Sequence, residues 1–208
     1  MNIILASESP ARKALLEKAG VSFSVFPAYI DEAGLIRELG ITTPAEHVLA
    51  LCEAKARFVC AKTNEPYIII AADTVIYHEG KILEKPIDLD DAFNMLKNLQ
   101  GKTHEVYTGV AVIVKNAVAN KEHLAIPDCG AAKTFYEVSK VRFRQLEDRE
   151  IIAYVKTGEA LGRSGSYAIN GIASLLIDGV NGDFNSVVGL PIAKVCAVLK
   201  EMGVYLLG

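Results

Sequence analysis

The residues that could do chemistry in this chain are charged side chains set among apolar or tightly turned segments. Asp73 follows the run YIIIAA, so its carboxylate is expected at the end of a buried central strand. An unpaired charge is costly in such a place. Asp73 should therefore bind a metal ion, act as a base or meet a cation, and the structural alternatives are a salt bridge or a turn cap.

Two lysines could supply positive charge near Asp73. Lys85 stands in LEKP, where Pro86 holds it extended, and the turn HEGK before it could return Lys85 toward the Asp73 strand. Lys55 lies in CEAKARF on a predicted helix. Isolated lysines are usually solvated, and that is the alternative for both.

The segment SESPAR is a candidate phosphate site. Ser9 and Pro10 fit the start of a helix, whose N–H groups and dipole attract an anion, and Ser7 and Arg12 add further donors. Because every helix start shares that dipole, ordinary capping by Ser9 with a solvated Arg12 is the alternative.

A second carboxylate could complete a metal site. Glu32, beside Asp31 in IDEAG, could join Asp73 around a hard divalent cation such as Mg²⁺ or Mn²⁺, although adjacent acids in a loop are usually solvated. The histidines form no HxxxH or HExxH pair, so zinc is not expected and His104 is interpreted as structural.

The segment GEALGRSGSYAING is rich in glycine and would allow a backbone to approach a ligand closely. Arg163 within it could reach a phosphate group. The spacing matches neither the Walker pattern nor GxGxxG, so a flexible turn is the alternative interpretation.

Alternating helical and strand patterns must position these residues. Capping residues and apolar periodicity predict helices at 9–20, 43–62, 88–101, 146–158 and 191–203. Strand composition or alternation predicts strands at 2–6, 21–26, 67–77, 103–115 and 134–146. A hairpin is expected within 177–184, and a loop of small and polar residues over 116–133.

Hairpins combined with helical crossovers predict an α/β fold with a mixed sheet and helices on its faces. The 208 residues could form one domain or two closely packed lobes around a cleft, and we expect a single domain over 1–208.

Composition excludes several classes of partner. A net charge of −3 argues against binding a polynucleotide, and no apolar run approaches the roughly 20 residues of a membrane span. The first residues do not resemble a secretory signal, so a cytoplasmic location is expected.

The cysteines show no CxxC spacing and are interpreted as reduced thiols: Cys52, Cys60, Cys129 and Cys196.

In its ordered motifs the chain resembles the Maf family of nucleoside triphosphate pyrophosphatases, named for a link to septum formation. The resemblance covers essentially the whole chain. It rests on LASESPAR, CEAKA, AADTVI, LEKP, LQGKTHEVYTGVAV, TGEALGRSGSYAING and GDFNSVVGLPI.

The resemblance implies an elongated, twisted sheet in two lobes around a nucleotide-binding cleft, often in a homodimer. It also implies that water cleaves a nucleoside triphosphate to the monophosphate and pyrophosphate with Mg²⁺ or Mn²⁺. The residues implied as catalytic are Asp73, Lys85, Lys55 and Arg12. Those implied to bind substrate are Ser7, Ser9, Thr74, Arg163 and Asn170, and those implied to hold the metal are Glu32 and Asp73.

Departures from the family pattern affect mainly the choice of base. Ala11 replaces the first of two usual arginines, and Gly162 replaces an aspartate. Asn170 replaces a glutamine that the family associates with pyrimidines such as dTTP and UTP, and Ser186 replaces a usual asparagine. Two alternatives stay open: a modified or purine triphosphate as substrate, and a non-catalytic nucleotide-binding regulator of cell division.

Overall fold

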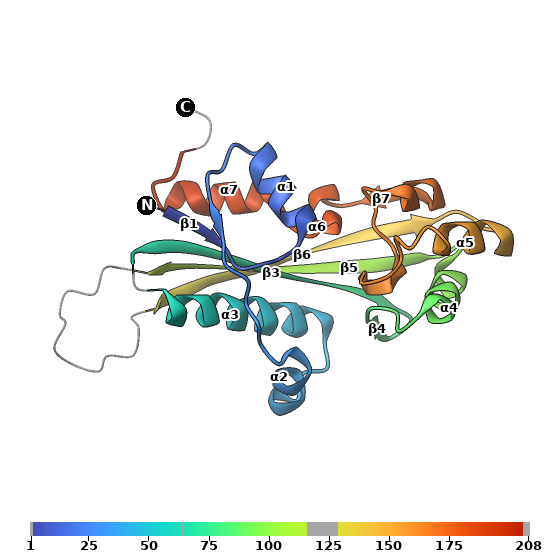
Figure 1. Cartoon of the computed structure of the whole chain (residues 1–208), viewed down its shortest axis with the longest axis horizontal. Helices are drawn as coiled ribbons and strands as arrows, with labels where there is room; N and C mark the ends of the chain where they lie inside the picture. Colours follow the sequence, from blue (N-terminus) through green and yellow to red (C-terminus); the bar gives the residue numbers. More distant parts are fainter. Residues whose placement is uncertain (1, 64, 116–128, 206–208) are drawn as a thin grey trace. The chain divides into compact units, whose positions relative to one another are not determined.

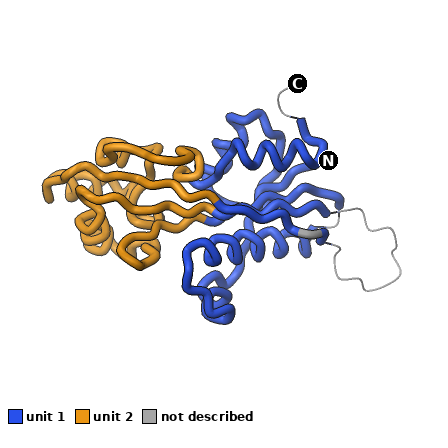
Figure 2. Tube along the Cα trace, turned by 180° about the vertical axis from the view of Figure 1, so that it is seen from behind, with its two compact units in different colours: residues 1–73, 109–136, 189–208 blue, residues 74–108, 137–188 orange. Residues whose placement is uncertain are grey.

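The computed structural model describes residues 2–63, 65–115 and 129–205 and divides into two compact units (Figure 2). Unit 1 comprises residues 1–73, 109–136 and 189–208. Unit 2 comprises residues 74–108 and 137–188.

The strands form the mixed sheet that the sequence predicts. Their order is β2-β1-β3-β5-β6-β7, with β4 paired to β3. β1 pairs in parallel with β2 and β3, whereas the β3–β4 and β6–β7 pairs are antiparallel. The strands are β1 (Asn2–Leu5), β2 (Ser24–Val25), β3 (Tyr67–His78), β4 (Lys81–Leu83), β5 (Thr103–Lys115), β6 (Cys129–Phe143) and β7 (Ile177–Asn181).

In unit 1, helices cover both faces of the strands, and alternate strand residues pack against different helices. The helices are α1 (Pro10–Lys18), α2 (Glu32–Leu39), α3 (Pro44–Lys62) and α7 (Ile192–Glu201). Ile68 and Ile70 of β3 pack in one cluster with residues of α1 and α7 (Figure 1). Ile69 and Ala71 pack on the other face in a cluster with α3. This alternation follows from the period of two in a strand.

Unit 2 has its own apolar core, built by helices on strands. Its helices are α4 (Leu89–Leu99), α5 (Asp148–Val155), α6 (Phe184–Val188) and the 3-10 turns η1 (Ser164–Ser166) and η2 (Ile172–Leu176). Leu96 of α4 and Ile151 of α5 are fully buried with Val141 and Phe143 of β6.

Capping residues mark helix starts where the sequence predicts them. The side chains of Ser9, Thr43 and Asp88 accept bonds from backbone N–H groups at the starts of α1, α3 and α4. Within the residues described, none of the helices has both the length and the apolar character that crossing a membrane would need.

Several local predictions are corrected. Helix α2 was not predicted; it has only eight residues, and none of them is buried. The strand predicted at 21–26 is limited to β2, and the predicted hairpin at 177–184 is the single strand β7 followed by α6. Residues 129–133, predicted as loop, begin β6, and residues 116–128 lie outside the described residues.

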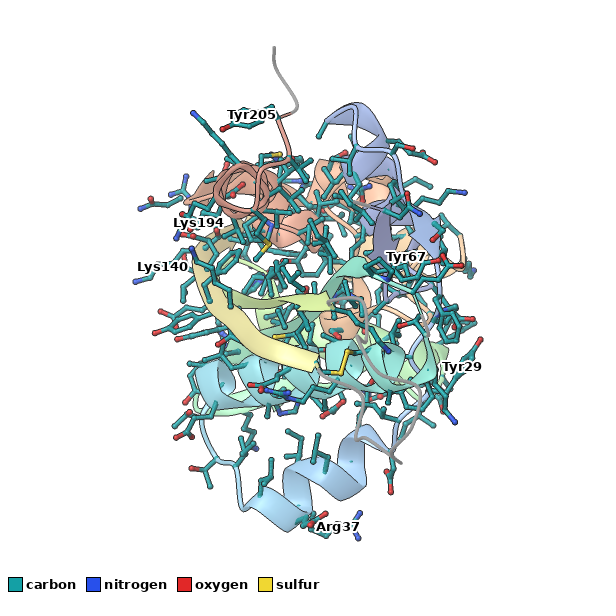
Figure 3. All side chains as sticks on the ribbon, turned by 90° about the vertical axis from the view of Figure 1, so that its left-hand side faces the viewer. Tyr29, Arg37, Tyr67, Lys140, Lys194 and Tyr205 are labelled. Atoms are coloured by element: carbon teal, nitrogen blue, oxygen red, sulfur yellow. A yellow bond between two sulfur atoms is a disulfide. The ribbon has the colours of Figure 1, made fainter. Side chains whose placement is uncertain are left out.

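The prediction of four reduced cysteines is wrong for one pair. Cys60 of α3 and Cys129 of β6 form a disulfide, visible as a yellow bond in Figure 3. Their spacing of 69 residues gives no local signal. Cys52 and Cys196 are thiols.

Candidate functional site

The carboxylate of Asp73 faces α3 because of its position in β3. Asp73 is two residues beyond Ala71 and so shares the α3 face of the strand. It lies inside β3, which continues to His78, so the expectation that it ends the strand is corrected. The β-branched residues Val75 and Ile76 extend the strand past the charge.

Lys55 meets this carboxylate from α3. It stands on the sheet-facing stripe of the helix with Cys52, Ala56 and Val59, at spacings of three and four residues. Its Nζ donates to Oδ1 of Asp73 at 2.7 Å, and each of the two residues is only 8% exposed. A solvated Lys55 is therefore excluded.

Glu32 brings a second carboxylate to the same ammonium group. It is the first residue of α2, whose N-cap Asp31 accepts a bond from Gly34 N. Oε1 of Glu32 lies 2.8 Å from Nζ of Lys55, and its side chain is half exposed. Lys55 thus bridges one buried and one accessible carboxylate.

These two carboxylates suit a hard divalent cation that takes further ligands from a substrate. The described residues contain no group of three or more His, Cys, Asp or Glu side chains arranged to hold a metal by themselves. Mg²⁺ typically binds through one or two carboxylates together with substrate phosphates and water. A cationic group already bridges Glu32 and Asp73, which shows that positive charge is accommodated there.

Arg12 is held in place by α1 and by a distant backbone carbonyl. Its Nε donates to the carbonyl oxygen of Gly189 at 2.9 Å, and its Nη1 donates to Oγ of Ser7 at 3.2 Å. Oγ of Ser9 accepts from Arg12 N at 3.4 Å, and Ser9 N donates to Ser7. The side chain is half-buried and anchored, so the solvated alternative is excluded.

The electrostatic surroundings of Arg12 connect it with the two carboxylates. Burial lowers the pKa of Arg12, while Asp73, Cys52 and Glu32 act to raise it. Burial, assisted by Asp73, raises the pKa of the Cys52 thiol to about 12. Cys52 is therefore a protonated packing residue and not a nucleophile.

In unit 2, Thr74 belongs to a chain of hydroxyl groups. Thr108 Oγ1 donates to the carbonyl of Ser186 at 2.7 Å, and the Thr74 and Thr108 hydroxyls are 2.9 Å apart. Because Thr108 donates to the carbonyl, Thr74 donates to Thr108. Ser186 Oγ is fully buried and contacts Ser139 Oγ, so the residue at this departure from the family pattern completes the network.

Lys85 and the glycine-rich segment also lie together in unit 2. Gly165 N donates to the carbonyl of Glu84 at 3.1 Å, next to Lys85. Lys85 and Arg163 are both exposed. Gly165 has a φ of +63°, and an added Cβ would lie 2.5 Å from Ile76 Cδ1, so a larger residue would disturb this junction.

Glu159 holds the segment that carries Asn170, and sequence reasoning missed it. Its carboxylate accepts from Ile172 N at 2.9 Å and from Ala173 N at 3.1 Å. A Cβ at Gly171 would lie 2.3 Å from the same carboxylate. The only sequence signal for Glu159 was its place at the start of a glycine-rich segment. Asn170 itself is exposed. Gly189, whose carbonyl accepts from Arg12, was missed because a backbone acceptor leaves no trace in residue type.

A cavity of about 330 Å³ in unit 2 contains none of the predicted site residues. It is lined by Tyr77, His78, Glu79, Thr103, His104, Glu105 and Lys140. His104 is buried there and shares a 2.7 Å hydrogen bond with Tyr167, in keeping with a structural role.

Comparison with known families gives a match over nearly the whole chain. The family model described as Maf-like protein matches residues 2–202. The chain belongs to the Maf family.

The chain is also similar over nearly its whole length to proteins named dTTP/UTP pyrophosphatases. The chain is 40% identical over 201 residues to a dTTP/UTP pyrophosphatase of Thermoanaerobacter sp. (strain X514), covering 97% of this chain and 96% of that relative. It is 41% identical over 203 residues to a dTTP/UTP pyrophosphatase of Bacillus thuringiensis subsp. konkukian (strain 97-27), with the same coverage.

A structural comparison finds a more distant protein. It is the nucleoside-triphosphatase, or dITP/XTP pyrophosphatase, of Mycobacterium abscessus, with 14% sequence identity and a TM-score of 0.39. The match covers 97% of this chain and 96% of the other.

Proposed function

We propose that this Maf-family protein is a nucleoside triphosphate pyrophosphatase that converts a pyrimidine triphosphate such as dTTP or UTP, with water, into the monophosphate and pyrophosphate. The support is the end-to-end similarity to relatives named dTTP/UTP pyrophosphatases. The observation in this chain that carries the proposal is the buried Asp73 carboxylate in contact with Lys55.

Asp73 is the proposed base. Attack of a water oxygen on the α-phosphorus forms one P–O bond and breaks the bond from the α-phosphorus to the oxygen that bridges to the β-phosphorus. The water proton passes to the carboxylate, and the electron pair of the broken bond leaves on pyrophosphate. Burial of Asp73 limits the number of waters that compete for this carboxylate.

Glu32 and Asp73 are the proposed ligands of a divalent cation, Mg²⁺ or Mn²⁺. When bound, such an ion neutralises charge on the phosphate oxygens in the transition state. The protein's own contribution is two carboxylates 2.7 and 2.8 Å from one positively charged atom.

Cationic side chains are proposed to stabilise the triphosphate and the departing pyrophosphate. Arg12 suits this role because bonds to Ser7 and Gly189 fix its guanidinium before substrate arrives. The N-terminus of α1, with Ser7 and Ser9, supplies further donors. Lys55, Lys85 and Arg163 add positive charge, and Thr74 a hydroxyl group.

Recognition of the base is assigned to the segment held by Glu159. Asn170 lies between buried Ile169 and the close contact at Gly171, so its amide is presented from a fixed backbone. An amide can pair with both a donor and an acceptor on a pyrimidine.

A homodimer, as the family resemblance implies, is part of this proposal, and light scattering of the purified chain tests it.

The first test is pyrophosphate release from a panel of canonical and modified nucleoside triphosphates with Mg²⁺ or Mn²⁺. We expect turnover of dTTP and UTP above the purine triphosphates. Asp73→Asn should abolish turnover while largely sparing nucleotide binding, because the amide cannot accept the proton from water.

The matched control is Asp178→Asn, which changes an exposed carboxylate paired with Arg142 in unit 2. This variant should retain the wild-type rate. A panel without turnover, but with nucleotide still bound, would reject the enzyme in favour of the non-catalytic regulator. Preferred turnover of a modified or purine triphosphate would reject only the proposed substrate.

A further inference from the structure

We infer that Lys55 keeps the carboxylates of Glu32 and Asp73 closed to a divalent cation that arrives alone, and releases them only to a metal–triphosphate complex. The inference rests on the proposed function and concerns the regulation of the same site. The substrate class it names is the preformed complex of a nucleoside triphosphate with a divalent metal ion.

The ammonium group of Lys55 occupies the position that a cation needs. Its Nζ lies 2.7 Å from Oδ1 of Asp73 and 2.8 Å from Oε1 of Glu32. A metal ion bound to these same oxygens would lie against the ammonium group. Two positive charges that close repel each other, most strongly beside the buried Asp73. These two oxygens can therefore hold the ammonium or the metal, but not both.

Because Lys55 is buried, its ammonium group needs another anion if it leaves the two carboxylates. Lys55 is only 8% exposed, so withdrawing its charge from both carboxylates without another anion would leave a buried charge uncompensated. A metal ion alone brings no such anion. A triphosphate does, because its oxygens can accept from the Lys55 ammonium as the carboxylates pass to the metal.

The charge of the cluster favours the complex over either component. The charges of two carboxylates, Glu32 and Asp73, are balanced by two cations, Lys55 and Arg12. Both carboxylates act to raise the pKa of Arg12. A lone divalent cation would make this cluster strongly positive. A metal–triphosphate complex carries net negative charge and is attracted to the two cations that the metal leaves available.

The small number of protein ligands points in the same direction. Among the described residues no third His, Cys, Asp or Glu completes a metal site around these carboxylates. The remaining ligands of a six-coordinate ion must then be phosphate oxygens and water. Lys55 also has a flexible stem, which lets its ammonium move without a change in the backbone of α3.

The test measures Mn²⁺ binding in the absence of nucleotide, from the loss of the electron paramagnetic resonance signal of aqueous Mn²⁺. The wild-type protein should bind Mn²⁺ weakly. Lys55→Met should bind it at least about tenfold more tightly, because two carboxylates lose their competing cation. Lys62→Met, on the exposed side of the same helix, is the control and should behave as wild type.

Further variants identify where the gained Mn²⁺ binds. Adding Glu32→Gln to Lys55→Met should remove the gain, and Lys55→Arg should show none because it keeps the positive charge. If Lys55→Met is unfolded by circular dichroism, the wild-type measurement decides alone. Tight binding of Mn²⁺ to the wild type that is lost on Glu32→Gln would overturn the inference.

The outcome is separable from that of the proposed function. Mn²⁺ binding is measured without turnover, so a catalytically inactive protein can still show exclusion by Lys55. An active pyrophosphatase whose Lys55→Met variant binds Mn²⁺ no better than wild type would disprove the inference and leave the proposed function intact.

Discussion

Arg12 shows how one residue can be prepared for an anion before the anion is present. A surface arginine must lose side-chain entropy when it binds phosphate. Arg12 has already lost much of it, since it is bonded to the backbone of Gly189 and to Ser7. Burial also weakens its hydration, which strengthens its attraction to a triphosphate.

Arg12→Ala should lower the turnover rate about 100-fold at saturating substrate, because a fixed cation near the developing negative charge is lost. Pyrophosphate release in the steady state measures this effect. Lys13→Ala is the control, since Lys13 is exposed and pairs only weakly with Glu17 at 3.8 Å. A wild-type rate in Arg12→Ala would remove Arg12 from the catalytic group.

Lys85→Ala should also reduce turnover about 100-fold, for the same electrostatic reason. Lys81→Ala removes an equivalent exposed charge from the neighbouring strand β4 and should have little effect. Single-turnover rates of both variants make the comparison. Equal rates would show that Lys85 is merely a solvated lysine.

Some side chains in this protein connect segments that are separated in the sequence. Glu159 bonds two N–H groups of the segment after Gly171, and a disulfide joins α3 to β6. Each connection fixes a segment that carries a candidate functional residue: Asn170 in the first case and Lys55 in the second.

Glu159→Ala should lower the free energy of unfolding by about 1–3 kcal/mol, because two backbone donors lose a charged acceptor. It should also reduce discrimination between pyrimidine and purine triphosphates. Urea unfolding and the nucleotide panel give the two readouts. Glu17→Ala, which removes an exposed ion pair, should change stability by less than about 0.5 kcal/mol. Unchanged stability in Glu159→Ala would contradict its role.

Cys129→Ser should lower the free energy of unfolding by about 4 kcal/mol, as expected for a cross-link that closes a loop of 69 residues. Melting temperatures with and without dithiothreitol measure the change, and Cys196→Ser is the control because Cys196 is a thiol. A thiol assay that finds four reactive cysteines in the denatured, unreduced protein would show that the disulfide is absent.

At the scale of the whole molecule, stability depends on pH through buried neutral groups. Burial, with a smaller effect of His78, lowers the pKa of His104 from 6.5 to about 3. Within the described residues its Nδ1 has no hydrogen-bond partner, and Nε2 is bonded to Tyr167. The Phe143 ring packs against the imidazole, with the ring centroids 5.5 Å apart.

His104 should therefore make the fold sensitive to acid. The unfolded chain protonates His104 below about pH 6.5, whereas the folded protein does so only near pH 3, so stability falls as the pH decreases through this window. At pH 5 the loss should be about 2 kcal/mol relative to neutral pH. Denaturant unfolding of wild type and His104→Gln from pH 7 to 4.5 measures the difference. A slope that His104→Gln leaves unchanged would assign the acid sensitivity elsewhere.

Much of the fold and part of the site follow from local sequence patterns. Capping at Ser9, Thr43 and Asp88 predicted three helix starts, and residue composition predicted β5 at residues 103–115. Helix α2 was missed because it is only eight residues long, and none of its residues is buried. Glu32 could therefore be proposed as a metal ligand, but its contact with Lys55 could not be foreseen.

By itself, the sequence determined the mixed α/β class, most element positions and the candidate side chains, because these depend on local periodicity, capping and residue type. Only the tertiary structure decided which of those side chains meet. The Lys55 bridge between Asp73 and Glu32, the anchoring of Arg12 by Gly189 and the Cys60–Cys129 disulfide join segments that are distant in the chain. Such contacts depend on strand register and on how helices pack on the strands, which local patterns do not encode.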